Sequence, residues 1–221
     1  MGYSLAPNTG FCFAGKQATF FNVEADDYFC LSLDATRSFA ATLSSDNSAD
    51  EDPDVWHSLM EGGLVLECPG PNSGFENFAL ASTDSIHGRR PSKVSAFSFL
   101  QALTDQLAAE RDLQRLGLRR AIGRLGKIDR SKNSGAPTRD DDLIGTAYVF
   151  YLSKRLLPTT NKCLSRSLAL TRRLHKNGIA ANLIIGVRTM PFSAHAWVQF
   201  NETVLNDYVE DIQRYTPIWV A

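Results

Sequence analysis

Several features that mark large classes of protein are missing from this chain of 221 residues. Its four cysteines form no CxxC pair and have no histidine at zinc-ligand spacing, so we expect neither a metal site nor a disulfide framework. No stretch reaches the ~18 consecutive apolar residues of a membrane span, and the N-terminus lacks the basic and apolar regions of a signal peptide. We therefore expect a globular protein of the cytoplasm that uses no cofactor.

Basic residues are scarce in the first part of the chain. Residues 1–85 contain 13 Asp and Glu against 2 Lys and Arg, whereas residues 86–221 contain 11 against 21. The apolar content of 43% is ample for a buried core. Two modules of opposite charge are the simplest interpretation of this asymmetry. Their charges nearly cancel, which is why the formal net charge is only −1.

The acidic module is predicted to combine a small antiparallel sheet with two helices. Apolar residues alternate over short runs, which is typical of half-buried strands. Asp34 is the expected N-cap of the first helix, and Pro53 suits the first turn of the second, which Gly62 and Gly63 end. The predicted strands cover residues 11–14, 18–23, 28–33 and 64–68.

The basic module is predicted to contain helices followed by strands. Residues 69–93 are rich in Gly, Pro, Ser and Asn, so we assign residues 81–93 to a linker between domains of residues 1–80 and 94–221. Apolar residues then recur at helical spacing, with a break near Gly117. The predicted elements are two helices within residues 94–126, helices over 140–157 and 162–176, a strand over 179–187 and a hairpin over 191–207.

Cys163 lies at the start of one of these predicted helices. A thiol is a useful nucleophile only as the thiolate, which the first turn of a helix favours through its unpaired N–H groups and its macrodipole. A cysteine here can also be a small buried apolar residue, which is the commoner case. The chain continues, however, through a strand to His195 and then to Asp207. This order is that of a Cys-His-Asp hydrolase site.

The predicted hairpin places His195 near the start of one strand and Asp207 at the end of the other. We take residues 201–203 as a three-residue loop, which puts the odd-numbered positions of both strands on one face. The two side chains are then expected within hydrogen-bonding reach. In this hypothesis Cys163 attacks a carbonyl carbon, His195 keeps the thiol ionised and protonates the leaving amine, and Asp207 orients the ring.

The segment around these three residues resembles the transglutaminase-like peptidases that mature lasso peptides. The resemblance covers about residues 162–207 and rests on NKCLSRSLALTRRLHKNGIAANLIIGV followed by PFSAHAWVQFNETVLND. It includes Cys163 with RSLAL behind it, AHAWV around His195, and LND ending at Asp207. The implied fold is α+β, with a C-terminal transglutaminase-like, papain-like cysteine peptidase domain.

The resemblance implies a bacterial leader peptidase. Such an enzyme cuts a ribosomally made lasso peptide precursor after its leader. The cut frees the N-terminus of the core peptide for macrolactam formation by a separate cyclase of the asparagine-synthetase type. The implied partners are therefore the precursor and this cyclase, with no nucleic acid and no membrane span.

Proteins of this family often carry an N-terminal leader-recognition element. It is a small three-stranded, winged-helix-like domain similar to the pyrroloquinoline-quinone peptide chaperone, and residues 18–23 and 27–31 resemble its second and third strands. In the family the leader adds as an extra strand beside the third strand, so that main-chain hydrogen bonds give affinity. The resemblance thus implies leader binding by Tyr28, Phe29, Cys30, Leu31, Leu59 and Met60.

Other functions are weaker or remain open. Acyl transfer, as in transglutaminases and arylamine acetyltransferases, uses the same triad and differs in whether an amine or water resolves the thioester. A non-catalytic leader-binding scaffold would usually have lost a triad residue, and all three are present. Papain itself is disfavoured because its His and Asn follow its Cys at far greater separation. Nucleic-acid binding by the Arg-rich residues 111–132 is disfavoured because no aromatic residues interleave with them.

Overall fold

The computed structural model describes residues 2–44, 52–86, 89–91, 94–125, 140–156 and 162–221. Contacts within the chain divide it into two compact units, each with helices and strands, so the fold is α+β as predicted. The domains predicted at 1–80 and 94–221 stay a prediction, because each unit also takes short segments from elsewhere in the chain. Unit 1 is Met1–Ala79, Gly186–Ala194 and Tyr215–Trp219, and unit 2 is Leu80–Ile185, His195–Arg214 and Val220–Ala221.

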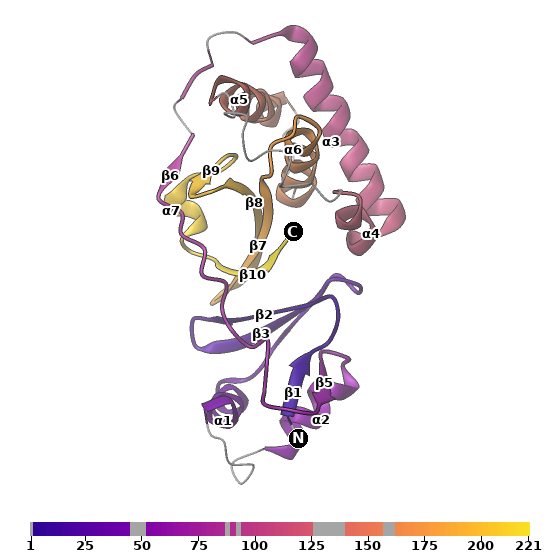
Figure 1. The fold of residues 1–221 in the computed structure, drawn as a ribbon, viewed down its shortest axis with the longest axis vertical. Helices are drawn as coiled ribbons and strands as arrows, with labels where there is room; N and C mark the ends of the chain where they lie inside the picture. Colours follow the sequence, from indigo (N-terminus) through magenta and orange to yellow (C-terminus); the bar gives the residue numbers. More distant parts are fainter. Residues whose placement is uncertain (1, 45–51, 87–88, 92–93, 126–139, 157–161) are drawn as a thin grey trace. The chain divides into compact units, whose positions relative to one another are not determined.

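Unit 1 contains a three-stranded antiparallel sheet in the order β2-β3-β4 (Figure 1). β2 (Thr9–Ala14) pairs with β3 (Gln17–Asn22), and β3 pairs with β4 (Asp27–Cys30). Within the described residues, β4 is therefore an edge strand. A second, two-stranded sheet joins β1 (Gly2–Leu5) to β5 (Val65–Cys68).

Aromatic side chains fill the core of unit 1. α1 (Leu33–Ser44) supplies Phe39 and α2 (Pro53–Glu61) supplies Trp56, and both side chains are buried. Ring centroids lie 5.7 Å apart between Phe39 and Phe20 of β3, and 4.9 Å apart between Phe39 and Trp56. Because burying one large apolar side chain contributes roughly 1.5–3 kcal/mol, this cluster holds both helices on the sheet.

Three details of unit 1 differ from the sequence-based expectation. The strand expected over residues 28–33 ends at Cys30. Ser32 caps α1 instead of Asp34, since Ser32 Oγ accepts a hydrogen bond from the N–H of Ala35 at 3.1 Å. The sequence pattern does not predict β1, because its partner strand lies far along the chain. Residues 45–51, between α1 and α2, lie outside the described part of the chain.

The helices of unit 2 include α3 to α6 (Figure 1). α3 and α4 are separated at Gly117, as predicted, where the backbone takes a φ of 76° that glycine adopts without strain. α6 packs against α3 and α5. The bounds are α3 (Ala96–Leu116), α4 (Leu118–Gly123), α5 (Asp140–Leu156) and α6 (Cys163–Lys176). In the stretches that the structure describes, no helix combines the length and apolar character needed to cross a membrane.

Ion pairs fasten α6 to α3. Arg172 donates to Asp112 at 2.9 Å, and Arg173 donates to Asp105 at 2.7 Å. Burial raises the pKa of Asp112, but hydrogen bonds from Arg172 and Arg124 more than offset this and hold that pKa below its usual value. Arg172 and Arg173 are therefore part of the basic excess of the second module, and both are paired with carboxylates between two packed helices.

A five-stranded sheet has the order β10-β7-β8-β9-β6. One edge strand of this sheet, β6, comes from the segment expected to be a linker, and it pairs in parallel with β9. A short helix, α7 (Val209–Ile212), follows β9 in the chain. The strands are β6 (Asp84–Ser85), β7 (Asn182–Thr189), β8 (Phe192–Phe200), β9 (Thr203–Val204) and β10 (Thr216–Val220).

The hairpin of β8 and β9 has a two-residue loop, and the predicted three-residue loop is wrong. Gln199 pairs with Val204 and Phe200 pairs with Thr203, which leaves Asn201 and Glu202 between the strands. Asn201 takes a φ of 51°, a value that asparagine tolerates better than most residues. In this register the odd-numbered residues of β8 share a face with the even-numbered residues of β9. The register argument that places His195 and Asp207 on one face is therefore wrong as well.

Asp207 lies beyond the paired part of the hairpin. The last ladder contact is the hydrogen bond from the N–H of Leu205 to the carbonyl of Val198, at 2.9 Å. The chain then leaves the ladder, so the side chain of Asp207 is no longer bound to the alternation of a strand. This departure lets it approach His195 in a way that loop length alone does not predict.

Candidate active site

Cys163 is the first residue of α6. Its thiol is half-buried, and the backbone N–H of Leu164, in the first turn of the helix, lowers the pKa of this thiol. The N–H groups of a first turn have no partner inside the helix, so they are available to an anion. The backbone N–H of Ala196 in β8 lowers the same pKa.

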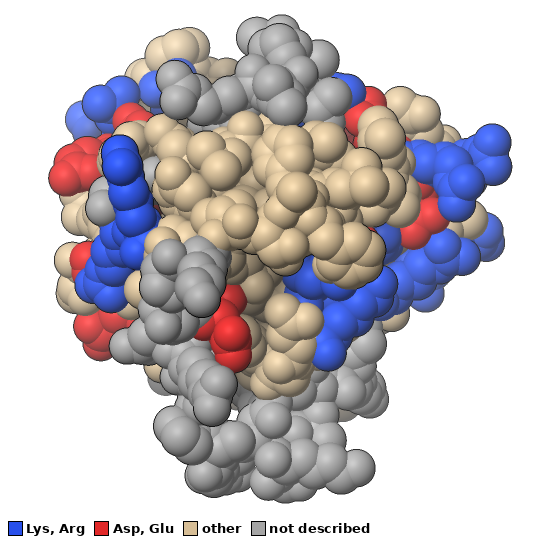
Figure 2. All heavy atoms as spheres, turned by 90° about the horizontal axis from the view of Figure 1, so that it is seen from above, with Lys and Arg blue, Asp and Glu red and all other residues tan. Residues whose placement is uncertain are grey.

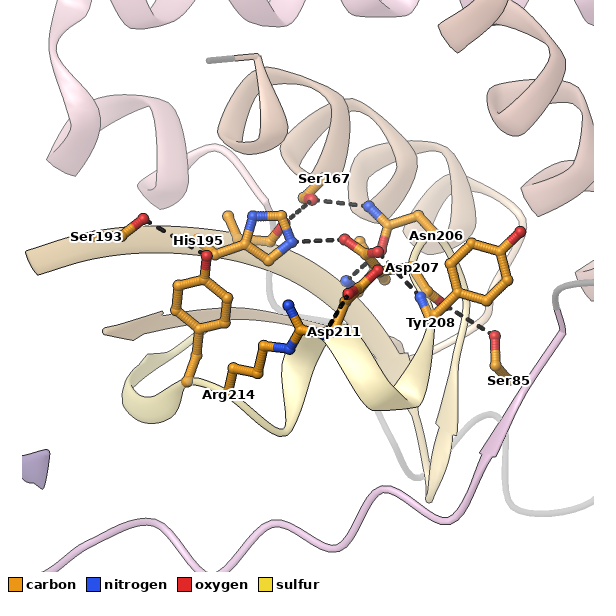
Figure 3. Close-up of polar contacts among 12 residues, drawn as sticks. Ser85, Ser167, Ser193, His195, Asn206, Asp207, Tyr208, Asp211 and Arg214 are labelled. Atoms are coloured by element: carbon orange, nitrogen blue, oxygen red, sulfur yellow. Dashed lines mark hydrogen bonds and ion pairs between the residues drawn. The ribbon is translucent and has the colours of Figure 1, made fainter. Parts of the chain in front are cut away.

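His195 and Asp207 point toward one another in Figure 3, with His195 Nε2 and Asp207 Oδ2 2.5 Å apart. Both side chains are mostly buried, at 21% and 14% exposed, so water screens their interaction only in part. Asp207 Oδ1 accepts a hydrogen bond from the N–H of Tyr208 at 3.0 Å. The main-chain carbonyl of Asp207 accepts one from the hydroxyl of Ser85 at 2.8 Å. The carboxylate is thus fixed at several points.

The thiol of Cys163 and the imidazole of His195 interact electrostatically, and each changes the pKa of the other. Burial raises the pKa of Cys163, but the hydrogen bond with His195, its positive charge and the two backbone N–H groups bring it below the ordinary value. Burial lowers the pKa of His195, but hydrogen bonds with Asp207 and Cys163 raise it to about 10 overall. Both shifts favour a thiolate–imidazolium pair at neutral pH.

Three polar residues behind this group are not predicted from the sequence, namely Ser85, Ser167 and Asn206. Ser85 belongs to the predicted linker, and nothing in that Ser-rich segment distinguishes it. Asn206 donates to Ser167, and Ser167 donates to the carbonyl of Ala196. The serine directly before the apolar run Leu168-Ala169-Leu170 is the signal that could have indicated a buried polar partner.

The residues expected to bind a leader lie on and behind β4 in unit 1. Phe29 is 41% exposed, and Cys30 is half-buried. Tyr28 stacks on Phe21 with ring centroids 4.4 Å apart, and it meets Phe192 edge-on at 5.4 Å. Tyr28 and Phe29 therefore present aromatic surface along the edge strand.

Leu31, Leu59 and Met60 lie deeper in unit 1. Leu31 and Leu59 are buried in its core, and Met60 packs against that core. The side chains of Leu31 and Leu59 consequently do not line an open groove. They support the sheet from behind the edge strand.

Unit 2 has a group of exposed arginines at the end of α3, on α4 and directly after α4. Figure 2 shows Lys and Arg side chains gathered along the margins of one face, around a broad area of uncharged residues. Among the residues that the structure describes, no group of His, Cys, Asp and Glu lies close enough together to hold a metal ion. The exposed arginines are Arg111, Arg115, Arg119, Arg120 and Arg124.

Comparisons with known proteins place this arrangement in a family. A family model described as the transglutaminase-like superfamily matches residues 105–220, which is more than half of the chain. A segment of 45 residues, 20% of this chain, is 51% identical to the microcin J25-processing protein McjB of Escherichia coli, and it spans 22% of that protein's length. No solved structure gives a significant match. From the long family match we conclude that the chain belongs to the transglutaminase-like superfamily.

Proposed function

We propose that this chain is a cysteine peptidase that removes the leader from a lasso peptide precursor. One observation carries the proposal: in a chain of the transglutaminase-like superfamily, His195 hydrogen-bonds Asp207 and also lowers the pKa of the Cys163 thiol. Peptide hydrolysis by a thiol nucleophile uses a base beside the thiol and a group, here a carboxylate, that orients the base. The identity with a segment of McjB, which processes the lasso peptide microcin J25, supports the choice of substrate.

In the first half of the reaction, the thiolate of Cys163 attacks the carbonyl carbon of the scissile peptide bond. Negative charge moves to the carbonyl oxygen, where the backbone N–H of Cys163 is the expected donor. When this intermediate collapses, the C–N bond breaks and the imidazolium of His195 gives its proton to the leaving amine. The core peptide departs with a free α-amine, and the leader remains as a thioester on Cys163.

In the second half, water resolves the thioester. Neutral His195 takes a proton from the attacking water, and the C–S bond breaks as the leader leaves with a carboxyl group. Cys163 returns as the thiolate beside the protonated ring of His195. Asp207 holds the ring in place and stabilises its positive form throughout. The net reaction consumes one water for each peptide bond.

We assign leader recognition to unit 1. Within the described residues β4 is an edge strand, beside which we expect the leader to add as a further strand, and Tyr28 and Phe29 offer aromatic surface there. Tethering the leader on the same chain as Cys163 raises the local concentration of the scissile bond, so a modest affinity at each site suffices. The freed core peptide then passes to a separate cyclase of the asparagine-synthetase type.

The test is mass spectrometry of a lasso precursor incubated with the full chain. We expect one cut, giving a leader that ends in a free carboxyl group and an unmodified core peptide. Cys163→Ala should abolish the cut, while isothermal titration shows that this variant still binds a synthetic leader peptide. Folded Cys163→Ala that cleaves at the normal rate would contradict the mechanism.

The same incubation with an added primary amine separates hydrolysis from acyl transfer. Both activities share the thioester on Cys163 and differ in what resolves it. A leader ending in an amide of the added amine would replace the peptidase proposal by acyl transfer. Leader binding without a cut by the wild-type chain would instead indicate a non-catalytic scaffold.

A further inference from the structure

A second chain of hydrogen bonds runs behind the residues that we assign to catalysis. Asn206 Nδ2 donates to Ser167 Oγ at 2.8 Å, and Ser167 Oγ donates to the carbonyl of Ala196 at 2.9 Å (Figure 3). Asn206 Oδ1 accepts from the backbone N–H of Val198 at 2.8 Å. Ser167 is fully buried, so its hydroxyl depends on these protein partners.

The partners fix the direction of this chain. The N–H of Val198 can only donate, so Asn206 must face it with its oxygen and turn its amide nitrogen toward Ser167. Ser167 Oγ therefore receives a hydrogen bond, and its one proton is left for the carbonyl of Ala196. A flipped amide would set two donors against each other at Val198. A single arrangement thus satisfies every group.

Ala196 ties β8 to α6 directly after His195. Its carbonyl accepts a hydrogen bond from Ser167, which lies one helical turn beyond Cys163 on α6. A slide of β8 along α6 by one residue would break this hydrogen bond. The position of Ser167 on the helix therefore sets the register of the strand that carries the imidazole.

Asn206 holds the carboxylate of Asp207 in the same way. It lies next to Asp207 in the chain, as Ala196 lies next to His195. Its amide joins β8 to α6 at the point where the chain has left the hairpin ladder, so it replaces the ladder in holding Asp207 near the strand.

We propose that Ser167 and Asn206 are positioning residues, which keep the thiol, the imidazole and the carboxylate in hydrogen-bonding register. The inference rests on the proposed function, because it assigns these residues a role toward the same three groups. Neither residue touches the reacting atoms. Their loss should therefore lower the reactivity of Cys163 without removing any group that takes part in bond making.

The test measures how fast iodoacetamide alkylates Cys163 as a function of pH, using mass spectrometry of the peptide that contains it. Ser167→Ala and Asn206→Ala each break the chain at a different link. We expect both variants to move the midpoint of alkylation upward by about one pH unit, which is about tenfold slower alkylation below the midpoint. In precursor cleavage, kcat should fall while KM changes little.

Thr171→Val provides the matched control. Thr171 is also fully buried on α6, one turn beyond Ser167, and its hydroxyl donates to the main-chain carbonyl of Ser167 at 2.9 Å. The substitution removes a buried hydroxyl whose hydrogen bond stays within α6. We expect a lower Tm and a wild-type alkylation profile. Ser167→Thr keeps the hydroxyl and should restore much of the reactivity lost in Ser167→Ala.

Wild-type alkylation profiles in both Ser167→Ala and Asn206→Ala, with Tm lowered as in Thr171→Val, would show a purely structural role and overturn the inference. An equal shift in Thr171→Val would overturn it too. If Ser167→Ala does not fold, Asn206→Ala decides, because Asn206 is only half-buried. Failure of the proposed function gives a different result. If wild-type Cys163 is alkylated like an ordinary thiol, with or without His195, both proposals fall, whereas an amide product from an added amine overturns the peptidase proposal alone.

Discussion

Cys12 in unit 1 and Cys163 in unit 2 are both enclosed thiols, and their pKa values shift in opposite directions. Burial raises the pKa of Cys12 to about 12, and nearby Cys30 adds to the effect. Burial raises the pKa of Cys163 as well, but hydrogen bonds and the charge of His195 bring it below its ordinary value. Burial by itself therefore makes a thiol inert, and polar partners decide whether an enclosed thiol is reactive.

The difference follows from the secondary structure around each sulfur. Cys12 lies in the middle of β2, where the ladder with β3 uses the backbone N–H groups. Cys163 lies at the first turn of α6, whose N–H groups have no partner within the helix. In a strand interior the thiolate thus finds no free backbone N–H group on its own strand. At a helix start it finds backbone N–H donors even without a polar side chain nearby.

The largest expected effect separates the two thiols directly. Cys163→Ala should lower the rate of precursor cleavage by about 10⁴-fold or more, as removal of a covalent nucleophile does. Cys12→Ala should keep the cleavage rate and lower only the Tm, because it trims a core residue. Rates come from mass spectrometry of the precursor and Tm from circular dichroism. Equal losses of activity in both folded variants would remove the distinction.

The partners of the thiol come next in size. His195→Ala should cost nearly as much as Cys163→Ala, because the thiolate loses the group that keeps it ionised. Asp207→Ala should be about 100-fold less severe, since the imidazole remains. Single-turnover kinetics of leader removal compare the two. Full activity of either variant would refute its assignment.

The pH dependence of cleavage tests the shifted pKa values. The thiolate of Cys163 is present above its lowered pKa, so kcat/KM should fall as the pH drops through that value. The imidazolium of His195, with a pKa raised to about 10, should persist at neutral pH and be lost as the pH rises through about 10. We expect a bell-shaped profile with an acid limb below the ordinary thiol range. A rate that rises only through the ordinary thiol range would contradict the ion pair.

The smallest effect concerns the edge of β4. Phe29→Ala should weaken leader binding about tenfold, as loss of one aromatic contact worth roughly 1.4 kcal/mol would do. Leu66→Ala is the matched control, because Leu66 is also an exposed apolar residue of a strand in unit 1. Isothermal titration of a leader peptide against both full-chain variants measures the difference. Equal affinities would exclude Phe29 from the leader site.

Local pattern predicts much of this fold because its signals lie close together in the sequence. The helix starting at Cys163, the break at Gly117 and strands β2 and β3 follow from caps, glycines and apolar alternation. The order of Cys163, His195 and Asp207 is also visible without a structure.

Long-range contacts are what the sequence does not predict. Ser85 reaches Asp207 from a segment with the composition of a linker. The hairpin loop has two residues instead of three because cross-strand packing, which is not encoded locally, sets its register. Asp207 still hydrogen-bonds His195, because Asn206 holds the chain beside β8 after it has left the ladder. Neither contact is visible in the local sequence pattern.

Alkylation of each cysteine by iodoacetamide across pH, in the wild-type chain and in His195→Ala, tests directly whether His195 activates Cys163. We expect Cys163 to react well below the ordinary thiol range and Cys12 to stay unreactive, and we expect His195→Ala to move the alkylation midpoint of Cys163 to higher pH. Identical profiles for Cys163 with and without His195 would show that the imidazole does not activate the thiol.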